Sequence, residues 1–270
     1  MEEIKTFNDK VSNIKTDIAT PLKIAVFTVC ATISTKIDLQ KLYDYRHLRN
    51  LWAFKYKPQD KKNIVPEIIS RDNKEKNKEL DNTFYNSIKI SFTYNDSNIS
   101  CKVFPNGKLH VAGSRTIEIA HEIPNLLYLF IKEIEPISCP IIDQKIVMIK
   151  TNFSFNKKIN QELLKNIINE KYRYDGSSGF FRLATFYPEQ FPGINIKFWS
   201  LRTRSYYKNK FTETNSKSNK IPTNKIDGQL SIFIFRSGKV SITAANINDL
   251  AESYFCITDI VRRHNEVLIN

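Results

Sequence analysis

The chain has 270 residues, of which 41% are hydrophobic, which is enough for one large domain or two modest ones with a buried core. Lysine and arginine outnumber aspartate and glutamate by 41 to 28, and the net charge of +13 favours an anionic partner, either nucleic acid or a membrane surface. No apolar run is long enough to span a membrane, and the first 25 residues lack the apolar core of a secretion signal. We therefore expect an intracellular protein.

The cysteines and histidines do not form a metal-binding pattern. There are four of each, they are scattered, and no C-x-x-C pair occurs. The sequence also contains no P-loop, no G-x-G-x-x-G and no G-x-S-x-G motif. We expect no metal, no cofactor, no catalytic residues and no enzymatic activity.

The expected elements, taken in chain order, run through one pattern twice. A charged, loosely ordered arm over 1–20 precedes a strand from Lys23, KIAVFTVCATIS, and a helix, IDLQKLYDYRHL. A hairpin from Cys101, CKVFPNGKLHVAG, and a second helix follow. The order then recurs with a strand from Lys145, KIVMIKTNFSF, a helix, INQELLKNIINEKY, and a hairpin from Ser231, SIFIFRSGKVSITA, with its helix. Each copy reads β, α, several β, α.

The two hairpins align without a gap, which identifies an internal repeat. Three residues of the first hairpin, Phe104, Gly107 and Lys108, match three of the second, which are Phe235, Gly238 and Lys239. The sequence predicts a first repeat over 21–135 with a basic insert at about 55–80, and a second repeat over 145–270 with a basic insert at about 201–228. Mobile loops with solvated charge are the default for both inserts. The alternative is that they extend a DNA or polymerase contact through Arg202, Arg204, Tyr206 and Tyr207.

Alternation along the hairpin strands separates two faces. Aliphatic residues point one way and belong under the helices, and these are Val103, Leu109, Val111, Ile232, Ile234, Val240 and Ile242. The opposite face mixes lysine, phenylalanine and small polar residues. Phe104 and Phe235 either close a small cluster at the hairpin tips or serve as wedges between bases on a nucleic-acid surface, with lysines for the phosphates.

Four segments resemble the TATA-box-binding protein family, specifically its divergent relatives in large DNA viruses. FYPEQFPGINIKF from Phe186 is similar to the family's stirrup, a segment in which an acidic residue precedes Phe-Pro-Gly and an apolar strand. SIFIFRSGKVSITAANI is similar to the family's strand pair. ATISTKIDLQKL and VFPNGKLHVAG are similar to the matching parts of the first repeat. The resemblance implies an α+β saddle, in which two pseudosymmetric repeats form a curved antiparallel sheet with helices on its convex face. It also implies that the concave face binds and bends DNA through the minor groove.

Carried over from the family, the wedge pair of the second repeat falls on Phe191 and Phe235. In the first repeat it falls on Phe104 and on Ser87, which is no wedge, unless a shifted stirrup brings in Phe84 or Tyr85. The expected DNA-binding residues are Phe104, Lys108, His110, Phe191, Lys197, Phe233, Phe235, Lys239, Ser241 and Thr243.

The departures from the family concern specificity. The base-reading asparagines of the family fall near Val26 and Met148, and of its paired threonines Thr243 is kept while Ala112 stands at the other place. We therefore expect a protein that senses groove width and deformability more than base identity.

The resemblance further implies an initiation factor that acts as a monomer on A·T-rich promoter DNA. A transcription factor IIB-like protein and RNA polymerase are the expected partners, contacted through Tyr187, Glu189 and Gln190. The expected compartment is the viral factory in the host cytoplasm, the virion, or the nucleus. One alternative is a scaffold of the same fold, in a viral transcription or virion complex, that no longer binds TATA DNA. An enzyme with a saddle-like domain is another, but almost no chain remains for a catalytic domain.

Overall fold

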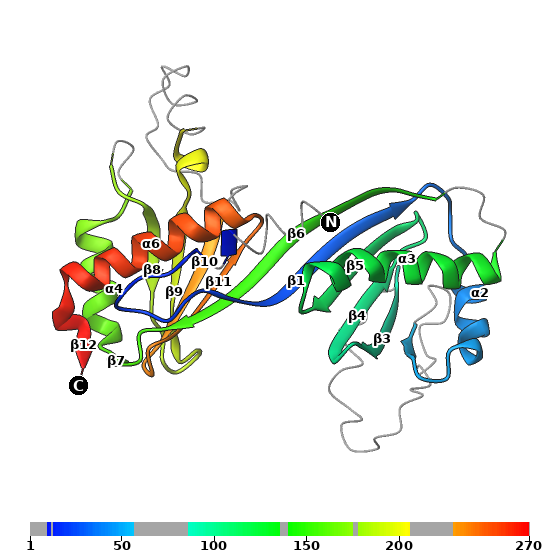
Figure 1. Ribbon diagram of the computed structural model, residues 1–270, viewed down its shortest axis with the longest axis horizontal. Helices are drawn as coiled ribbons and strands as arrows, with labels where there is room; N and C mark the ends of the chain where they lie inside the picture. The colour runs from blue at the N-terminus through cyan, green and yellow to red at the C-terminus, as the bar shows by residue number, and fades with distance from the viewer. Residues whose placement is uncertain are drawn as a thin grey trace. The chain divides into compact units, whose positions relative to one another are not determined.

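The computed structural model describes residues 10–11, 13–56, 86–135, 140–174, 178–205 and 229–269. The chain divides into two compact units (Figure 1). The first unit is Val26–Val147, and the second is Met148–Asn270 together with Met1–Ala25. The boundary falls inside strands β1 and β6, so each of these strands contributes to both units.

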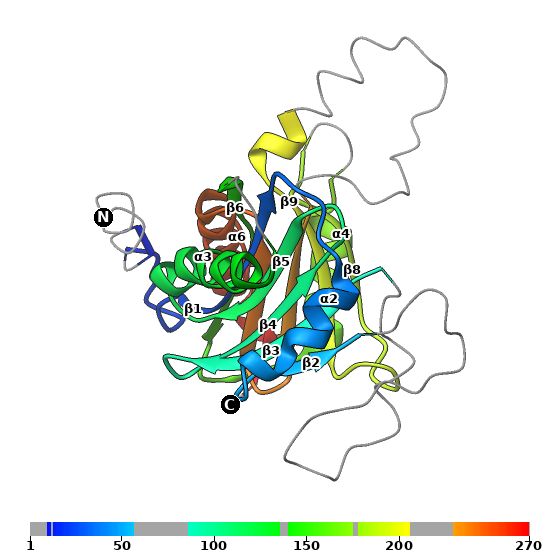
Figure 2. The ribbon, with the colours of Figure 1, turned by 90° about the vertical axis from the view of Figure 1, so that its right-hand side faces the viewer.

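The first unit has the β, α, several β, α order that the sequence predicts. Its elements are β1 (Lys23–Ile33), α2 (Leu39–Asp44), η1 (Tyr45–Leu48), β2 (Ala53–Lys55), β3 (Ile88–Tyr94), β4 (Ser97–Val103), β5 (Lys108–Ser114) and α3 (Ile117–Ile134). The strands lie in the order β2-β3-β4-β5-β1, followed by β6 (Ile141–Ser154). Helix α3 contacts β5 and α2, and Figure 2 shows α3 beside β5.

The second unit repeats this order. Its elements are β7 (Lys158–Ile159), α4 (Gln161–Lys171), β8 (Phe181–Thr185), β9 (Gly193–Trp199), β10 (Gln229–Phe235), β11 (Lys239–Ala244), α6 (Ile247–Arg263), η3 (Asn265–Val267) and β12 (Leu268–Ile269). The strands lie in the order β6-β11-β10-β9-β8, and neighbours pair antiparallel. Helix α6 contacts β11, and α4 contacts β8 and β9.

In each unit the aliphatic face of the hairpin lies under the helices, as the alternation predicts. Val103 and Val111 in the first hairpin, and Ile232 and Ile242 in the second, are fully buried. The opposite side chains of the same strands are half-buried or exposed, apart from Ser114 and Ser241. We call this other side the open face of each unit, because no helix of the described residues contacts it. Burial of the aliphatic face is the main stabilising contribution in each unit.

The hairpin turns show how closely the repeats match. Gly107 and Gly238 have φ values of +79° and +80°, a conformation that favours glycine. A Cβ at Gly107 would lie 2.1 Å from the Ile33 carbonyl oxygen, and a Cβ at Gly238 the same distance from that of Lys157. Both copies therefore require glycine in the turn, because φ is positive and a carbonyl oxygen leaves no space for a Cβ.

The arm expected over 1–20 is packed where the structure describes it. Ile14 is buried, and Thr20 and Ser154 exchange hydrogen bonds, with the Thr20 N–H donating to the Ser154 carbonyl at 2.8 Å. The Tyr254 hydroxyl of α6 donates to the Thr20 carbonyl at 3.0 Å, and Asp17 forms an ion pair with Arg262. Residues 13–20 are thus part of the second unit rather than a loose arm. Among the helices that the structure describes, none is long and apolar enough to cross a membrane.

Candidate nucleic-acid interface

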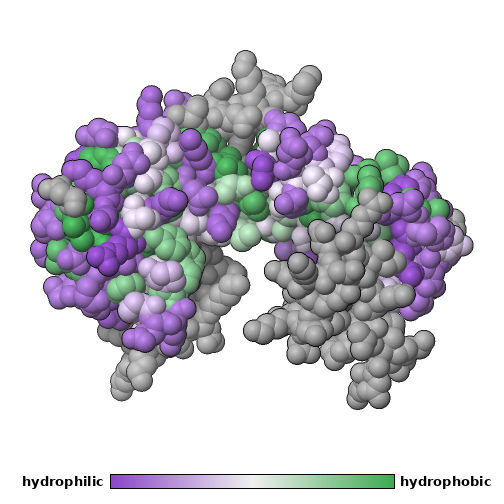
Figure 3. Space-filling model, turned by 90° about the horizontal axis from the view of Figure 1, so that it is seen from below, coloured by the Kyte–Doolittle hydropathy of each residue, from purple (hydrophilic) through white to green (hydrophobic). Residues whose placement is uncertain are grey.

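Three phenylalanines form a cluster on the open face of the second unit. Phe191 lies 5.4 Å from Phe233 and 5.7 Å from Phe235 between ring centroids, and it is 40% exposed. We call these three residues the aromatic cluster. In Figure 3, an apolar area of the second unit, at the left, lies next to hydrophilic surface. One exposed ring grouped with two half-buried rings on a helix-free sheet face is an arrangement that suits a base-inserting surface.

Gly193 makes room for the aromatic cluster. It lies directly opposite Phe235 on the neighbouring strand, and a Cβ there would come within 2.8 Å of the Phe191 ring and 3.2 Å of the Phe235 ring. The Phe-Pro-Gly sequence of the stirrup therefore has a packing reason in this chain: the glycine lets both rings lie over the end of β9.

The turn between β8 and β9 presents the expected partner residues. The N–H groups of Gln190 and Phe191 both donate to the Tyr187 carbonyl, at 3.0 and 2.9 Å. Tyr187, Glu189 and Gln190 are exposed, and Tyr187 reaches 62%. The turn thus orients Phe191 toward the open face while three other side chains remain accessible to a protein.

The remaining predicted residues of the second repeat share this face. Lys197 donates to the Ser231 hydroxyl at 2.8 Å, and Ser231 lies directly opposite Thr243. Ser241 lies opposite Phe233 on the neighbouring strand and is 9% exposed. The Ser241 hydroxyl is buried, and among the described residues it has no hydrogen-bond partner. Buried polar atoms of this kind normally have a partner, so this position suits a surface that a ligand completes.

Each unit has a hollow on its open face, and the two hollows are built from equivalent residues. The hollow of the second unit measures about 720 Å³, and its lining includes Phe235, Lys239, Ser241, Asn152 and Lys23. The hollow of the first unit measures about 580 Å³, and the matching lining residues are Phe104, Lys108, His110, Cys30 and Lys145. Two lysines and one phenylalanine thus recur in both repeats. The sequence prediction included the turn lysines but missed Lys23 and Lys145, which only the strand register brings to these hollows.

Partial burial shifts the pKa of His110 and that of Cys30 in opposite directions. Burial lowers the pKa of His110, and the nearby charge of Lys102 lowers it further. Burial raises the pKa of the Cys30 thiol, although Lys145 and Lys108 oppose this shift. The thiol is therefore not an activated nucleophile. The described residues also contain no group of histidine, cysteine or carboxylate side chains that could hold a metal ion.

The strand register changes the correspondence at the first-repeat stirrup. Ile88 lies opposite Val103 as Ile194 lies opposite Ile234, so Ser87 corresponds to Gly193 and not to a wedge residue. Ser87 is 2% exposed, which agrees with that place. Counting back two residues, the counterpart of Phe191 is position 85. Phe84 and Tyr85, the substitutes considered from the sequence, lie outside the described residues.

Phe104 differs from its counterpart Phe235. It is half-buried beside the hollow of the first unit, and no aromatic ring of the described residues pairs with it. One prediction from the sequence was that Phe104 and Phe235 close a small cluster at the hairpin tips. Among the described residues, Phe104 forms no such cluster. At Phe235 a cluster exists, but one of its rings is exposed.

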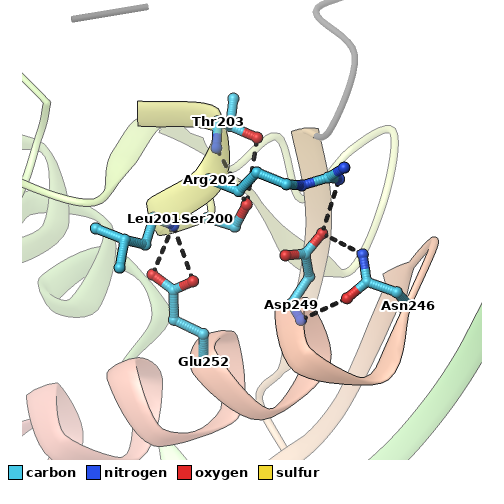
Figure 4. A network of polar contacts seen from close by, with 7 residues as sticks. All are labelled: Ser200, Leu201, Arg202, Thr203, Asn246, Asp249 and Glu252. Carbon is cyan, nitrogen blue, oxygen red and sulfur yellow. Dashed lines mark hydrogen bonds and ion pairs between the residues drawn. The ribbon is translucent and has the colours of Figure 1, made fainter. Parts of the chain in front are cut away.

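The second basic insert begins on the side of the sheet that the helices cover. Figure 4 shows contacts that hold this segment to α6, among them the Leu201 N–H, which donates to the Glu252 carboxylate at 2.8 Å. Glu252 also pairs with Arg204 at 2.6 Å. Arg202 pairs with Asp249 at 3.4 Å. Carboxylates of α6 thus pair with both arginines, and the contact of this insert with DNA or polymerase stays a prediction. Tyr206, Tyr207 and most of both inserts lie outside the described residues.

Comparisons with known proteins agree with this geometry. No protein-family model matches the sequence. A TATA-box-binding protein-like protein of Acanthamoeba polyphaga mimivirus is 26% identical over 211 residues, which cover 71% of this chain and 51% of the relative. The chain therefore matches only about half the length of that relative.

A solved structure of similar fold is the Methanococcus jannaschii TBP. It superposes with a TM-score of 0.51 at 17% identity, over 90% of this chain and 98% of that one. The match supports the predicted α+β saddle class, with its large antiparallel sheet and few helices. The chain is thus similar in sequence to a viral TATA-box-binding protein-like protein and has the fold of an archaeal TBP, as the resemblance implies.

Proposed function

We propose that the chain is a non-enzymatic transcription initiation factor that binds duplex DNA through the minor groove and bends it. The observation that carries the proposal is the aromatic cluster, in which Phe191 and Phe235 lie over Gly193 on the open face. Inserting such rings costs a few kcal/mol of unstacking per base step, and the bent duplex then covers more protein surface. Lys197 and Lys239 flank the cluster on the same face and suit the phosphates.

The exposed stirrup turn supports a second part of the proposal, which is recruitment of a transcription factor IIB-like protein and RNA polymerase. Tyr187 and Glu189 remain accessible when Phe191 faces DNA, since they project from the same turn but are not in the aromatic cluster. We propose that one copy of the chain binds DNA. The scaffold alternative is not favoured by the relatives found.

A bending assay tests the wedge assignment. Duplexes of random, A·T-rich and TATA-containing sequence, labelled at both ends for fluorescence energy transfer, are titrated at several salt concentrations. We expect the parent to bend at least the A·T-rich duplexes. The Phe191→Ala/Phe235→Ala variant should lose the bend and keep much of the non-specific affinity, because its lysines are intact.

The matched control is Phe255→Ala, which removes a ring of similar exposure, 44%, from helix α6. This control should bend DNA as the parent does. A double variant that bends DNA as well as the parent would show that Phe191 and Phe235 are not the wedges.

A further inference from the structure

The open face of the first unit carries a row of basic side chains that crosses its strands. Lys55 on β2 lies directly opposite Lys89 on β3, and Lys89 lies opposite Lys102 on β4. Lys102 in turn lies opposite His110 on β5, which lies opposite Cys30 on β1. We call Lys55, Lys89, Lys102 and His110 the basic row.

The basic row places positive charge on neighbouring strands at close spacing. Side chains directly opposite each other on such strands have Cβ atoms about 5 Å apart. Strands β1 to β5 contain neither aspartate nor glutamate. A polyanion laid across these strands would meet a basic side chain on each of four of them.

The spacing of the row suits a phosphodiester backbone. Neighbouring strands lie about 4.8 Å apart, so the three lysines extend over about 10 Å. This length is about the axial rise of three nucleotides of one DNA strand. The row also runs into the hollow of the first unit, whose lining includes Lys108, Lys145 and a single acid, Asp143. Positive charge therefore continues beyond β5.

The second unit lacks the basic row at the equivalent place. The register that matches Ser87 with Gly193 also matches Lys89 with Asn195. The hairpin alignment matches Lys102 with Phe233, and His110 with Ser241. The second unit thus has the neutral residues Asn195, Phe233 and Ser241 at the places of three basic residues of the first unit. The two repeats have the same fold and different surface chemistry.

We propose that the open face of the first unit binds the phosphate backbone of duplex DNA through the basic row. This unit supplies affinity that depends on salt and not on sequence, while the aromatic cluster of the second unit supplies the bend. The inference rests on the proposed function, since it assigns one part of DNA binding to each repeat.

The test replaces two lysines of the row by glutamine, as Lys89→Gln/Lys102→Gln, in the full chain. Binding to a 30-base-pair A·T-rich duplex is measured at five salt concentrations, and bending is measured at saturating protein. Two phosphate contacts contribute about 1.8 to the slope of log K against log salt, so the slope should fall by about that amount. The bend at saturation should equal that of the parent, because the aromatic cluster is unchanged.

Two further variants separate a backbone contact from a general charge effect. Lys41→Gln/Lys132→Gln removes the same charge from helices α2 and α3 and should leave the slope as in the parent. Lys89→Arg/Lys102→Arg keeps the charge and should keep the slope.

The outcomes distinguish the two proposals. A parent that bends DNA, combined with an unchanged slope in Lys89→Gln/Lys102→Gln, overturns the basic row and leaves the proposed function standing. An equal drop of slope in the helix control also overturns it, because the effect would then come from net charge. A parent that binds no duplex at low salt overturns the proposed function itself.

Discussion

His110 is a titratable side chain surrounded by positive charge. The charged side chains near its ring are Lys102 on β4, Lys108 on its own strand β5, and Asp143 and Lys145 on β6. Its pKa lies below the ordinary 6.5 because of burial first and Lys102 second. The unfolded chain therefore takes up a proton at higher pH than the folded chain. The free energy of unfolding should fall as the pH drops from about 6.5 through the folded pKa.

We predict that duplex DNA raises the pKa of His110, because phosphates beside the ring favour the imidazolium form. Lys102→Gln should also raise it in the free protein, by removing one repelling charge. A titration of the His110 ring protons by nuclear magnetic resonance, with and without DNA, measures both shifts. If the pKa in the complex equals the pKa of the free protein, the phosphates do not lie beside His110.

Single residues show where sequence reasoning succeeds and where it stops. The placement of Phe191 and Phe235 on one sheet face is predictable because each lies in a distinctive local motif, Phe-Pro-Gly and Phe-x-x-Gly-Lys, while their role as wedges stays a prediction. Ser87 was matched to the wrong residue because the first stirrup is interrupted by an insert, and only the strand pairing restores its correspondence with Gly193. Lys89 gave no signal in the sequence, since its neighbours in the basic row come from other strands.

The two hairpin turns have nearly the same backbone conformation and the same close contact at their glycines. We predict that Gly107→Ala and Gly238→Ala destabilise the protein to a similar extent, each by about 1–3 kcal/mol, because each adds a Cβ in a left-handed conformation. Each Cβ would also meet a carbonyl oxygen of the preceding strand end or turn. Urea unfolding followed by circular dichroism measures the change.

Ser237→Ala is the control for this prediction, since Ser237 is an exposed residue of the same turn. It should change the free energy of unfolding by less than about 0.5 kcal/mol. A glycine variant as stable as this control would mean that the turn can adopt another conformation, and that the match between the two repeats does not depend on it.

The order and type of the elements followed from the sequence because local patterns determine them. Alternation identified the hairpin strands, and the cap residues Asp38 and Asn160 begin α2 and α4 at equivalent places. The placement of the turn 201–205 could not be predicted in the same way. Arg202 and Arg204 are spaced like a basic patch, and only the tertiary structure brings Asp249 and Glu252 of α6 beside them.

At the scale of the whole molecule, the repeat has diverged in surface chemistry more than in fold. Both units keep a turn glycine, a turn lysine and a hollow with a phenylalanine. They differ in the rows that cross the open face, which are basic in the first unit and aromatic with polar neighbours in the second. The net charge of +13 could be read from the sequence, but its concentration in one row depends on the register of four strand pairs.

This arrangement predicts weak discrimination among A·T-rich sequences. Val26 and Met148 stand where the family resemblance implies base-reading asparagines, and the minor groove itself distinguishes little beyond A·T from G·C. Phosphate contacts and bending then supply most of the affinity, so flexible, easily kinked steps should matter more than an exact TATA sequence. We expect a TATA-containing duplex and a scrambled duplex of the same composition to bind within about tenfold, or about 1.4 kcal/mol. A G·C-rich duplex should bind more weakly than both.

Competition binding at two salt concentrations measures these ratios of affinity. A hundredfold preference for the TATA duplex would mean that other side chains of the open face read individual bases.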